Sequence, residues 1–242
     1  MAEKTVGEAI AYRRSVRIYD TKQPLDTALV KKCIEQATIA PTSSNLQLWE
    51  FYHITSEEMK AKIATACLSQ TATRTAQQFV VCVARKDLWK KRVQANLDFL
   101  EAQFAKQEVR DTKREKMATS YYRKIIPALY SNFLGISGLL MRILTTFRGW
   151  SAPTYRQVMA SDLDIVAHKS TALAAQNFMI SMASFGYDTC PMEGFDSVLV
   201  KKALGLPKQA MITMVISCGI RAKGGIYGPQ FRVPFTSVYY ER

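Results

Sequence analysis

Three short segments of this 242-residue chain carry charged, hydroxyl and amide groups that suit an anionic, aromatic ligand. The first is Arg13-Arg14-Ser15-Val16-Arg17. Its three guanidinium groups and hydroxyl can hold a phosphate, and one cation can lie near a developing negative charge. Basic residues at the end of a helix also complement the helix dipole, so a structural role stays open for this segment.

The second and third segments offer hydrogen-bonding groups for the rest of such a ligand. Residues 40–49 (Ala-Pro-Thr-Ser-Ser-Asn-Leu-Gln-Leu-Trp) could bond the edge of a heterocycle, although Ser, Thr and Asn are also common in capped turns. Residues 190–196 (Cys-Pro-Met-Glu-Gly-Phe-Asp) form a Pro- and Gly-bearing loop before a helix. Its backbone N–H groups can point at a ligand atom and Gly194 allows close approach, but an ordinary connection would have the same composition.

Other chemistries have less support. The sequence has no G-x-G-x-x-G after a strand, P-loop, H-E-x-x-H or G-x-S-x-G motif. His53 and His168 lie far apart, and structural roles are favoured for both over catalysis or metal binding. The five scattered cysteines form no C-x-x-C pair, so we expect reduced thiols, no metal, and core packing rather than a redox role for Cys190.

Hydrophobic periodicity and capping residues predict the elements that position these segments. A capping box at Thr5 and Glu8 opens a helix to about Arg13. The other predicted helices cover residues 24–41, 56–67, 86–122 with a possible break, 161–185 from a Ser161 cap, and 196–204. Strands are predicted at 49–55, 79–84 and 210–220. Helices outnumber strands, which indicates an α+β fold with a small covered sheet.

Residues 125–141 are uncharged and contain Pro127, Gly135 and Gly138. Because spanning a bilayer takes about 20 uninterrupted apolar residues, we expect no membrane span. A buried helical hairpin or a flap over a ligand pocket is favoured; a membrane-surface or partner-binding segment is the alternative.

The formal charge of +13 raises the question of nucleic acid. The densest basic clusters are interleaved with acidic residues at helical spacing, and no recognition motif accompanies them, so no nucleic-acid partner is expected. The N-terminus lacks the apolar stretch of a secretory signal, and with the cysteine usage this predicts a cytoplasmic protein.

Taken together, the three segments resemble motifs of the nitroreductase family in their residue types and in their order along the chain. Arg-x-Ser-x-Arg comes first, then Pro-Thr-Ser-Ser-Asn-x-Gln-x-Trp, then Pro-Met-Glu-Gly-Phe-Asp before Leu-Gly-Leu-Pro. The resemblance implies a three-layer α-β-α sandwich with a small, mainly antiparallel sheet. It further implies one domain over residues 1–242, with a helical and apolar insertion at about 105–155, and an entwined homodimer in which residues 231–242 embrace the partner.

The resemblance also implies FMN at the dimer interface. Arg13, Arg14 and Ser15 would hold its phosphate and ribityl chain, and Arg17 would lie near flavin N1 and O2, where negative charge accumulates on reduction. The residues reaching the partner's flavin would be Pro41, Thr42, Ser43, Asn45 and Gln47. Those along the isoalloxazine would be Pro191, Met192, Glu193 and Gly194, with a backbone N–H of Glu193 or Gly194 directed at N5.

Some positions depart from the family pattern. Leu48 replaces the usual proline before the tryptophan, and Gln230 stands where a late lysine is common, next to Arg232 as the late phosphate contact. Gln70 and Arg74 are possible substitutes for a mid-chain Asn and Lys that touch the pyrimidine ring.

The activity implied is ping-pong hydride transfer from NADPH or NADH through flavin N5 to nitroaromatics, quinones or flavins. The cofactor supplies the reactivity, so no catalytic side chain is required. The alternatives are a flavin-binding or storage protein without turnover, and a specialised relative that fragments flavin or removes halogen. We expect the insertion to shape the mouth of the pocket.

Overall fold

The computed structural model describes residues 3–109, 111–131 and 136–242. Its α-helices are α1 (Val6–Tyr12), α2 (Thr27–Ala37), α3 (Glu57–Ala66), α4 (Thr71–Arg74), α5 (Trp89–Ala105), α6 (Thr112–Ser120), α7 (Ile126–Tyr130), α8 (Ile136–Arg148), α9 (Ala160–Ser184) and α10 (Ser197–Ala203). The strands are β1 (Trp49–Ile54), β2 (Gln78–Ala84), β3 (Asp188–Met192) and β4 (Met211–Gly219). Short 3-10 helices are η1 (Ser43–Asn45), η2 (Lys86–Leu88) and η4 (Phe235–Ser237), and η3 (Tyr121–Ile125) is a short π-helix.

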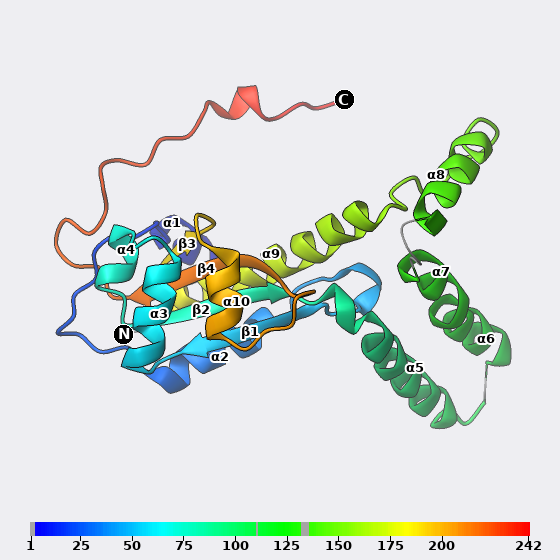
Figure 1. The fold of residues 1–242 in the computed structure, drawn as a ribbon, viewed down its shortest axis with the longest axis horizontal. Coiled ribbons are helices and arrows are strands. Elements are labelled where there is room, and N and C mark those ends of the chain that lie inside the picture. The colour runs from blue at the N-terminus through cyan, green and yellow to red at the C-terminus, as the bar shows by residue number, and fades with distance from the viewer. Residues whose placement is uncertain (1–2, 110, 132–135) are drawn as a thin grey trace.

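The described strands form one antiparallel sheet in the order β1-β2-β4-β3. Side chains alternate across a strand, so β2 buries Phe79 and Val81 on one face and Val80 and Cys82 on the other. Helices α3 and α10 cover the first face, and α2 and α9 cover the second (Figure 1). This covering on both faces explains why the two central strands, β2 and β4, are largely apolar, and it confirms the predicted three-layer α+β fold.

Capping residues fix several helix starts as predicted. The Thr5 backbone N–H donates to Glu8 Oε2 at 2.8 Å, and the Glu8 N–H returns to Thr5 Oγ1 at 3.4 Å. The predicted Ser161 cap of the long helix is wrong. Helix α9 begins one residue earlier, where the Met159 N–H donates to the Asp162 carboxylate at 3.0 Å.

Strand β3 is the main element that the sequence prediction missed. Residues 190–192 were expected in a loop, but they complete an edge strand that pairs Cys190 with Ser217 and Met192 with Val215. Pro191 disguises the strand in the sequence. A proline is tolerated here because it removes a donor only from the edge of a sheet.

Helices α5 to α8 form an arm that extends away from the three layers (Figure 1). Its base has a small core in which Val93, Leu97 and Ile126 pack against Leu46 and Leu48. The expected buried hairpin at 125–141 is wrong for its second half, because Leu139 and Leu140 are exposed. Residues 132–135 lie outside the described residues.

The chain beyond β4 forms an extended tail that leaves the body (Figure 1). Its apolar side chains at Phe231, Phe235 and Tyr240 are all exposed. The only regular element described there is η4, and residues 238–240 lie outside any strand despite their β propensity.

Candidate functional site

The N-terminal basic segment is clamped between β3 and the start of the tail. Ser15 forms a bridge with Thr189, and the Val16 N–H donates to the Thr189 carbonyl at 3.2 Å. The Arg17 N–H donates to the Gly225 carbonyl at 2.7 Å. Since Val16 is fully buried in this extended stretch, Ser15 and Arg17 point to the opposite side, away from the core.

These side chains line a hollow of about 310 Å³. Its walls bring together six predicted residues from the first segment and the tail, and they are Arg13, Arg14, Ser15, Arg17, Gln230 and Arg232. Arg14 Nη2 donates to the Gly228 carbonyl at 3.0 Å, which ties the two parts of the chain. Partial burial lowers the pKa of Arg13, and the charges of Arg232 and Arg14 lower it further. The hollow therefore holds several positive charges close together, and a bound anion would reduce the repulsion between them.

The end of β3 adjoins this hollow. Burial raises the pKa of the Cys190 thiol, and the nearby charges of Arg17 and Arg13 oppose that shift. After β3 the chain turns outward, so that Glu193 and Gly194 are exposed while the Met192 side chain is buried in the core. Met192 can therefore offer a ligand its backbone but not its side chain.

Gln70 connects the mid-chain turn before α4 to the same loop. Its Nε2 donates to the Gly194 carbonyl at 2.6 Å. Arg74, on α4, is exposed and donates to the Ser69 carbonyl at 3.2 Å. The structure thus places Gln70 beside the predicted isoalloxazine loop.

The second segment, residues 41–47, lies elsewhere, before β1. Ser44, Asn45 and Gln47 adopt positive φ, which bends the chain sharply. Hydrogen bonds fix this bend, including Gln47 N–H to Thr42 Oγ1 at 3.3 Å and Asn45 Nδ2 to Asn96 Oδ1 at 2.9 Å. Leu46 and Leu48 are buried, whereas Ser43 and Asn45 are exposed and Gln47 is half-buried.

A second hollow of about 340 Å³ lies beside this bend. It is lined by Pro41, Thr42 and Ser43 and, from α9, by Val166, Lys169, Ser170 and Leu173. The Ser43 N–H donates to Ser170 Oγ at 3.4 Å. Sequence reasoning missed Lys169 and Ser170, because their position on a long helix carries no signal of their proximity to residue 43.

Comparison with known proteins places this arrangement. A sequence model described as the nitroreductase family matches residues 10–220. The chain belongs to the nitroreductase family. It is 25% identical over 241 residues to "Putative NAD(P)H nitroreductase YdgI" of Bacillus subtilis, covering 96% of this chain and 94% of the relative.

Solved structures agree on the fold. This nitroreductase is similar to a "putative NAD(P)H:FMN oxidoreductase" from Staphylococcus epidermidis, with a TM-score of 0.76 and 20% identity over 100% of this chain and 98% of that one. It is also similar to a "putative nitroreductase in complex with FMN" from Exiguobacterium sibiricum, with a TM-score of 0.71 and 24% identity over 100% and 99%. At these identities the likeness establishes the nitroreductase fold.

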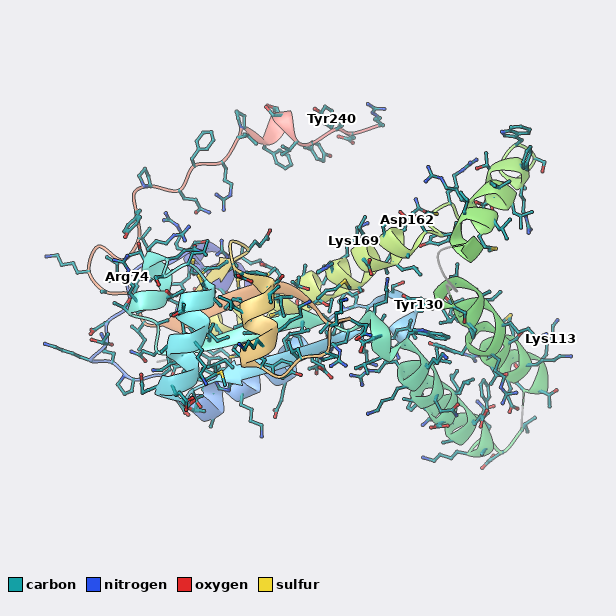
Figure 2. The ribbon with its side chains drawn as sticks, in the orientation of Figure 1. Arg74, Lys113, Tyr130, Asp162, Lys169 and Tyr240 are labelled. Carbon is teal, nitrogen blue, oxygen red and sulfur yellow. The ribbon has the colours of Figure 1, made fainter. Side chains whose placement is uncertain are left out.

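In this nitroreductase, one chain does not bring all the predicted residues together. β1 and β3 are the two edges of the described sheet, three strand spacings or about 14 Å apart. Trp49 pairs with Ala84 near one end of β2, whereas β3 pairs with the half of β4 beyond Met214, so the two groups also lie at opposite ends. Figure 2 shows that Arg74, the predicted pyrimidine contact, lies well apart from Lys169, which lines the second hollow.

Both histidines have polar side-chain partners. His53 Nε2 lies 2.7 Å from Gln78 Oε1, and His168 Nδ1 lies 2.9 Å from Thr213 Oγ1. Burial lowers the pKa of His168 despite the nearby Asp164. In the part of the chain that is described, no cluster of His, Cys, Asp or Glu could hold a metal ion, and no helix is long and apolar enough to cross a bilayer.

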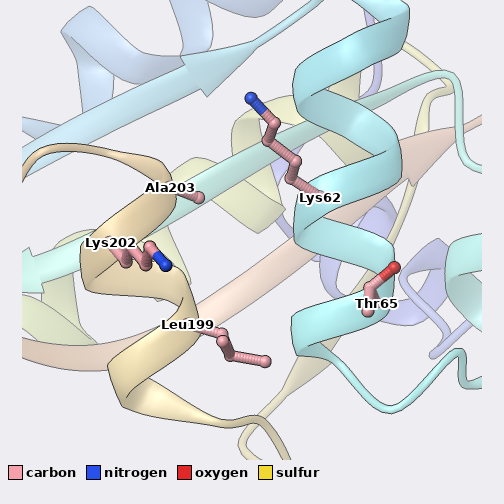
Figure 3. A pocket seen from close by; sticks show the side chains of 5 residues that line it. All are labelled: Lys62, Thr65, Leu199, Lys202 and Ala203. Carbon is pink, nitrogen blue, oxygen red and sulfur yellow. The ribbon is translucent and has the colours of Figure 1, made fainter.

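A further groove of about 360 Å³ lies between α3 and α10 (Figure 3). It is lined by Lys62, Thr65, Leu199, Lys202 and Ala203. Lys62 is paired with Glu58 at 2.6 Å, so part of its charge is already compensated.

Proposed function

We propose that this nitroreductase is an FMN-dependent oxidoreductase that uses NADPH or NADH to reduce nitroaromatics, quinones or flavins. The names of its relatives support this activity, since one is called an NAD(P)H nitroreductase and another holds FMN. The observation that carries the proposal is the arginine-lined hollow beside the end of β3.

This hollow fits the phosphate of FMN. Arg13, Arg14, Arg17 and Arg232 line one small space, and Ser15 adds an exposed hydroxyl. Guanidinium groups bind phosphate through paired, charge-assisted hydrogen bonds. Burial lowers the pKa of Arg13, the charges of Arg232 and Arg14 lower it further, and a bound dianion would offset both effects.

The loop after β3 would support the heterocycle. Gly194 has no side chain to obstruct a flat ring, and Gln70 holds its carbonyl group through a hydrogen bond. Arg17 would place its charge at the pyrimidine edge, while Glu193 and Gly194 would offer a backbone N–H. When bound, FMN would supply the hydride-transfer chemistry. The protein would then need only to bind and orient the cofactor and the substrate and to keep water away from them.

Two copies of the chain would complete the site. Residues 41–47 and the hollow lie at opposite edges and ends of the sheet, so they can meet at one cofactor only across an interface. The exposed aromatic tail supplies apolar surface that a partner would cover. The proposed assembly is therefore a homodimer with FMN between its subunits.

The arm would flank the substrate beside residues 41–47. Tyr121 and Ser44 hydroxyls lie 2.7 Å apart, and Tyr122 donates to the Ser44 carbonyl at 2.9 Å. Aromatic side chains next to this bend favour flat substrates, in line with the predicted role of the insertion.

The test is an absorbance spectrum of the purified protein before and after anaerobic addition of NADPH and then NADH. We expect flavin bands that either nucleotide bleaches. Arg13→Gln should weaken FMN binding by roughly tenfold, as expected for one lost charged hydrogen bond, whereas Arg114→Gln on the exposed face of α6 should not. Persistent bands would favour a binder without turnover, and a protein that cannot be loaded with FMN would overturn the proposal.

A further inference from the structure

Helix α8 presents an apolar stripe that the rest of the described chain leaves uncovered. Its side chains recur every three or four residues and therefore share one side of the helix. They are Leu139, Leu140, Ile143, Leu144 and Phe147, and Trp150 extends the stripe just beyond the helix. All six are exposed, Phe147 by 58% and Trp150 by 77%.

The opposite side of α8 is occupied by the chain that follows it. Arg156 Nη2 donates to the Gly149 carbonyl at 3.2 Å. A Cβ at Gly149 would lie 2.2 Å from the same nitrogen, so a larger residue here would displace the end of the Arg156 side chain. Met141, Thr145 and Gly149 on this side are half-buried, whereas the apolar stripe faces outward.

The charges around the stripe have one sign. From Lys116 to Ser161 the sequence contains six Lys or Arg residues and no Asp or Glu. One of these cations, Arg123, is paired with Glu101 at 2.6 Å. Two others, Arg142 and Arg148, lie on α8 itself. At 100° per residue they flank the apolar stripe, one on each side.

We infer that α8 docks in the plane of an anionic lipid bilayer. The apolar stripe would lie between the acyl chains, with Arg142 and Arg148 at the level of the lipid phosphates and Trp150 at the interface. A second copy of this face would bring more cations and no carboxylate, whereas anionic lipid supplies the opposite charge. Charge complementarity therefore favours the bilayer over self-association.

Within one chain, the position of α8 leaves the arginine-lined hollow open. The arm holds α8 away from the sheet layers (Figure 1), and the hollow lies beside β3 in the body. The inference does not depend on the proposed oxidoreductase activity.

The test is co-sedimentation of the full chain with vesicles of phosphatidylcholine alone or mixed equally with phosphatidylglycerol. We expect binding only to the anionic vesicles, with roughly tenfold weakening in Phe147→Glu and about fivefold weakening for each of Arg142→Gln and Arg148→Gln. Phe99→Glu is the matched control, because Phe99 lies on α5 of the same arm and is 61% exposed.

A second readout follows Trp150. Its fluorescence should shift to the blue on anionic vesicles, and Trp150→Gln should remove most of that shift. The inference is overturned if the wild-type chain ignores anionic vesicles, or if Phe147→Glu and Phe99→Glu bind them equally. It is also overturned if Phe147→Glu, still folded by circular dichroism, changes only the sedimentation coefficient, since a second copy would then cover the stripe.

Discussion

The Asp188–Arg221 ion pair should control both stability and the placement of the basic segment. The Asp188 side chain is 1% exposed and accepts from the Arg221 backbone N–H at 2.7 Å and from its Nε at 2.8 Å. Arg221 Nη2 also donates to the Tyr12 carbonyl at 3.1 Å, and its guanidinium lies 4.0 Å from the centre of the Tyr12 ring. Arg13 follows directly, so this pair joins β3 to the start of the proposed phosphate site.

The perturbation is Asp188→Asn, which keeps the shape of the side chain and removes its charge. Removing one partner of a fully buried pair costs about 3–5 kcal/mol. Arg221 keeps 27% of its side-chain exposure, so water can solvate part of the orphaned charge. We therefore expect a loss of about 2–3 kcal/mol, and at this chain length a fall in Tm of about 5–10 °C.

The assay is thermal unfolding at one fixed protein concentration, together with FMN titration. Asp98→Asn is the control, because Asp98 is exposed on α5 and accepts from Gln94 Nε2 at 2.7 Å, within its own helix. Its effect should stay within about 0.5 kcal/mol. Equal Tm values for the two variants would refute the reasoning. It would also be refuted if the double variant Asp188→Asn/Arg221→Met lost more unfolding free energy than its two single variants together.

Three further outcomes are expected. Removing residues 233–242, whose apolar side chains are exposed, should convert a dimer into a monomer in sedimentation velocity without unfolding the body; an unchanged sedimentation coefficient would contradict this. Because burial holds the pKa of His168 below 6.5, the unfolded chain binds more protons, so stability should fall as pH drops from 7 towards 5. His168→Gln should flatten that dependence in urea titrations, and a variant as pH-sensitive as the wild type would show that another group is responsible. Cys190, buried and with a raised pKa, should resist iodoacetamide at pH 8 in the folded protein, and rapid alkylation there would show that the thiol is accessible.

Local chemistry in the sequence predicted most of the body. The Thr5 and Glu8 capping box, the apolar periodicity of α2 and the continuous apolar runs of β2 and β4 are local signals, and each element formed where it was expected. Strand β3 was missed because its five residues include Pro191, and only pairing with β4 makes them a strand. The Met159 cap was missed because Ser161 offers the more usual side chain.

For the candidate site, the sequence determined which residue types are present, and the tertiary structure decided which of them meet. Arg13 and Arg232 are more than two hundred residues apart, and they share a hollow because β3 and the tail both pack against the segment between Arg13 and Arg17. Residues 41–47 carry an equally clear sequence signal, yet they lie at the far edge of the sheet. Strand order creates this separation, and it arises from long-range pairing that local sequence does not encode.

The arm shows the same division. The apolar character of residues 136–150 follows from the sequence alone, because side-chain type and helical spacing are local properties. Whether such a helix is buried depends on what packs against it, and in the described chain Arg156 returns to Gly149 on the side opposite the apolar stripe. The sequence therefore shows that α8 has an apolar side. The tertiary structure shows that the described chain leaves this side exposed.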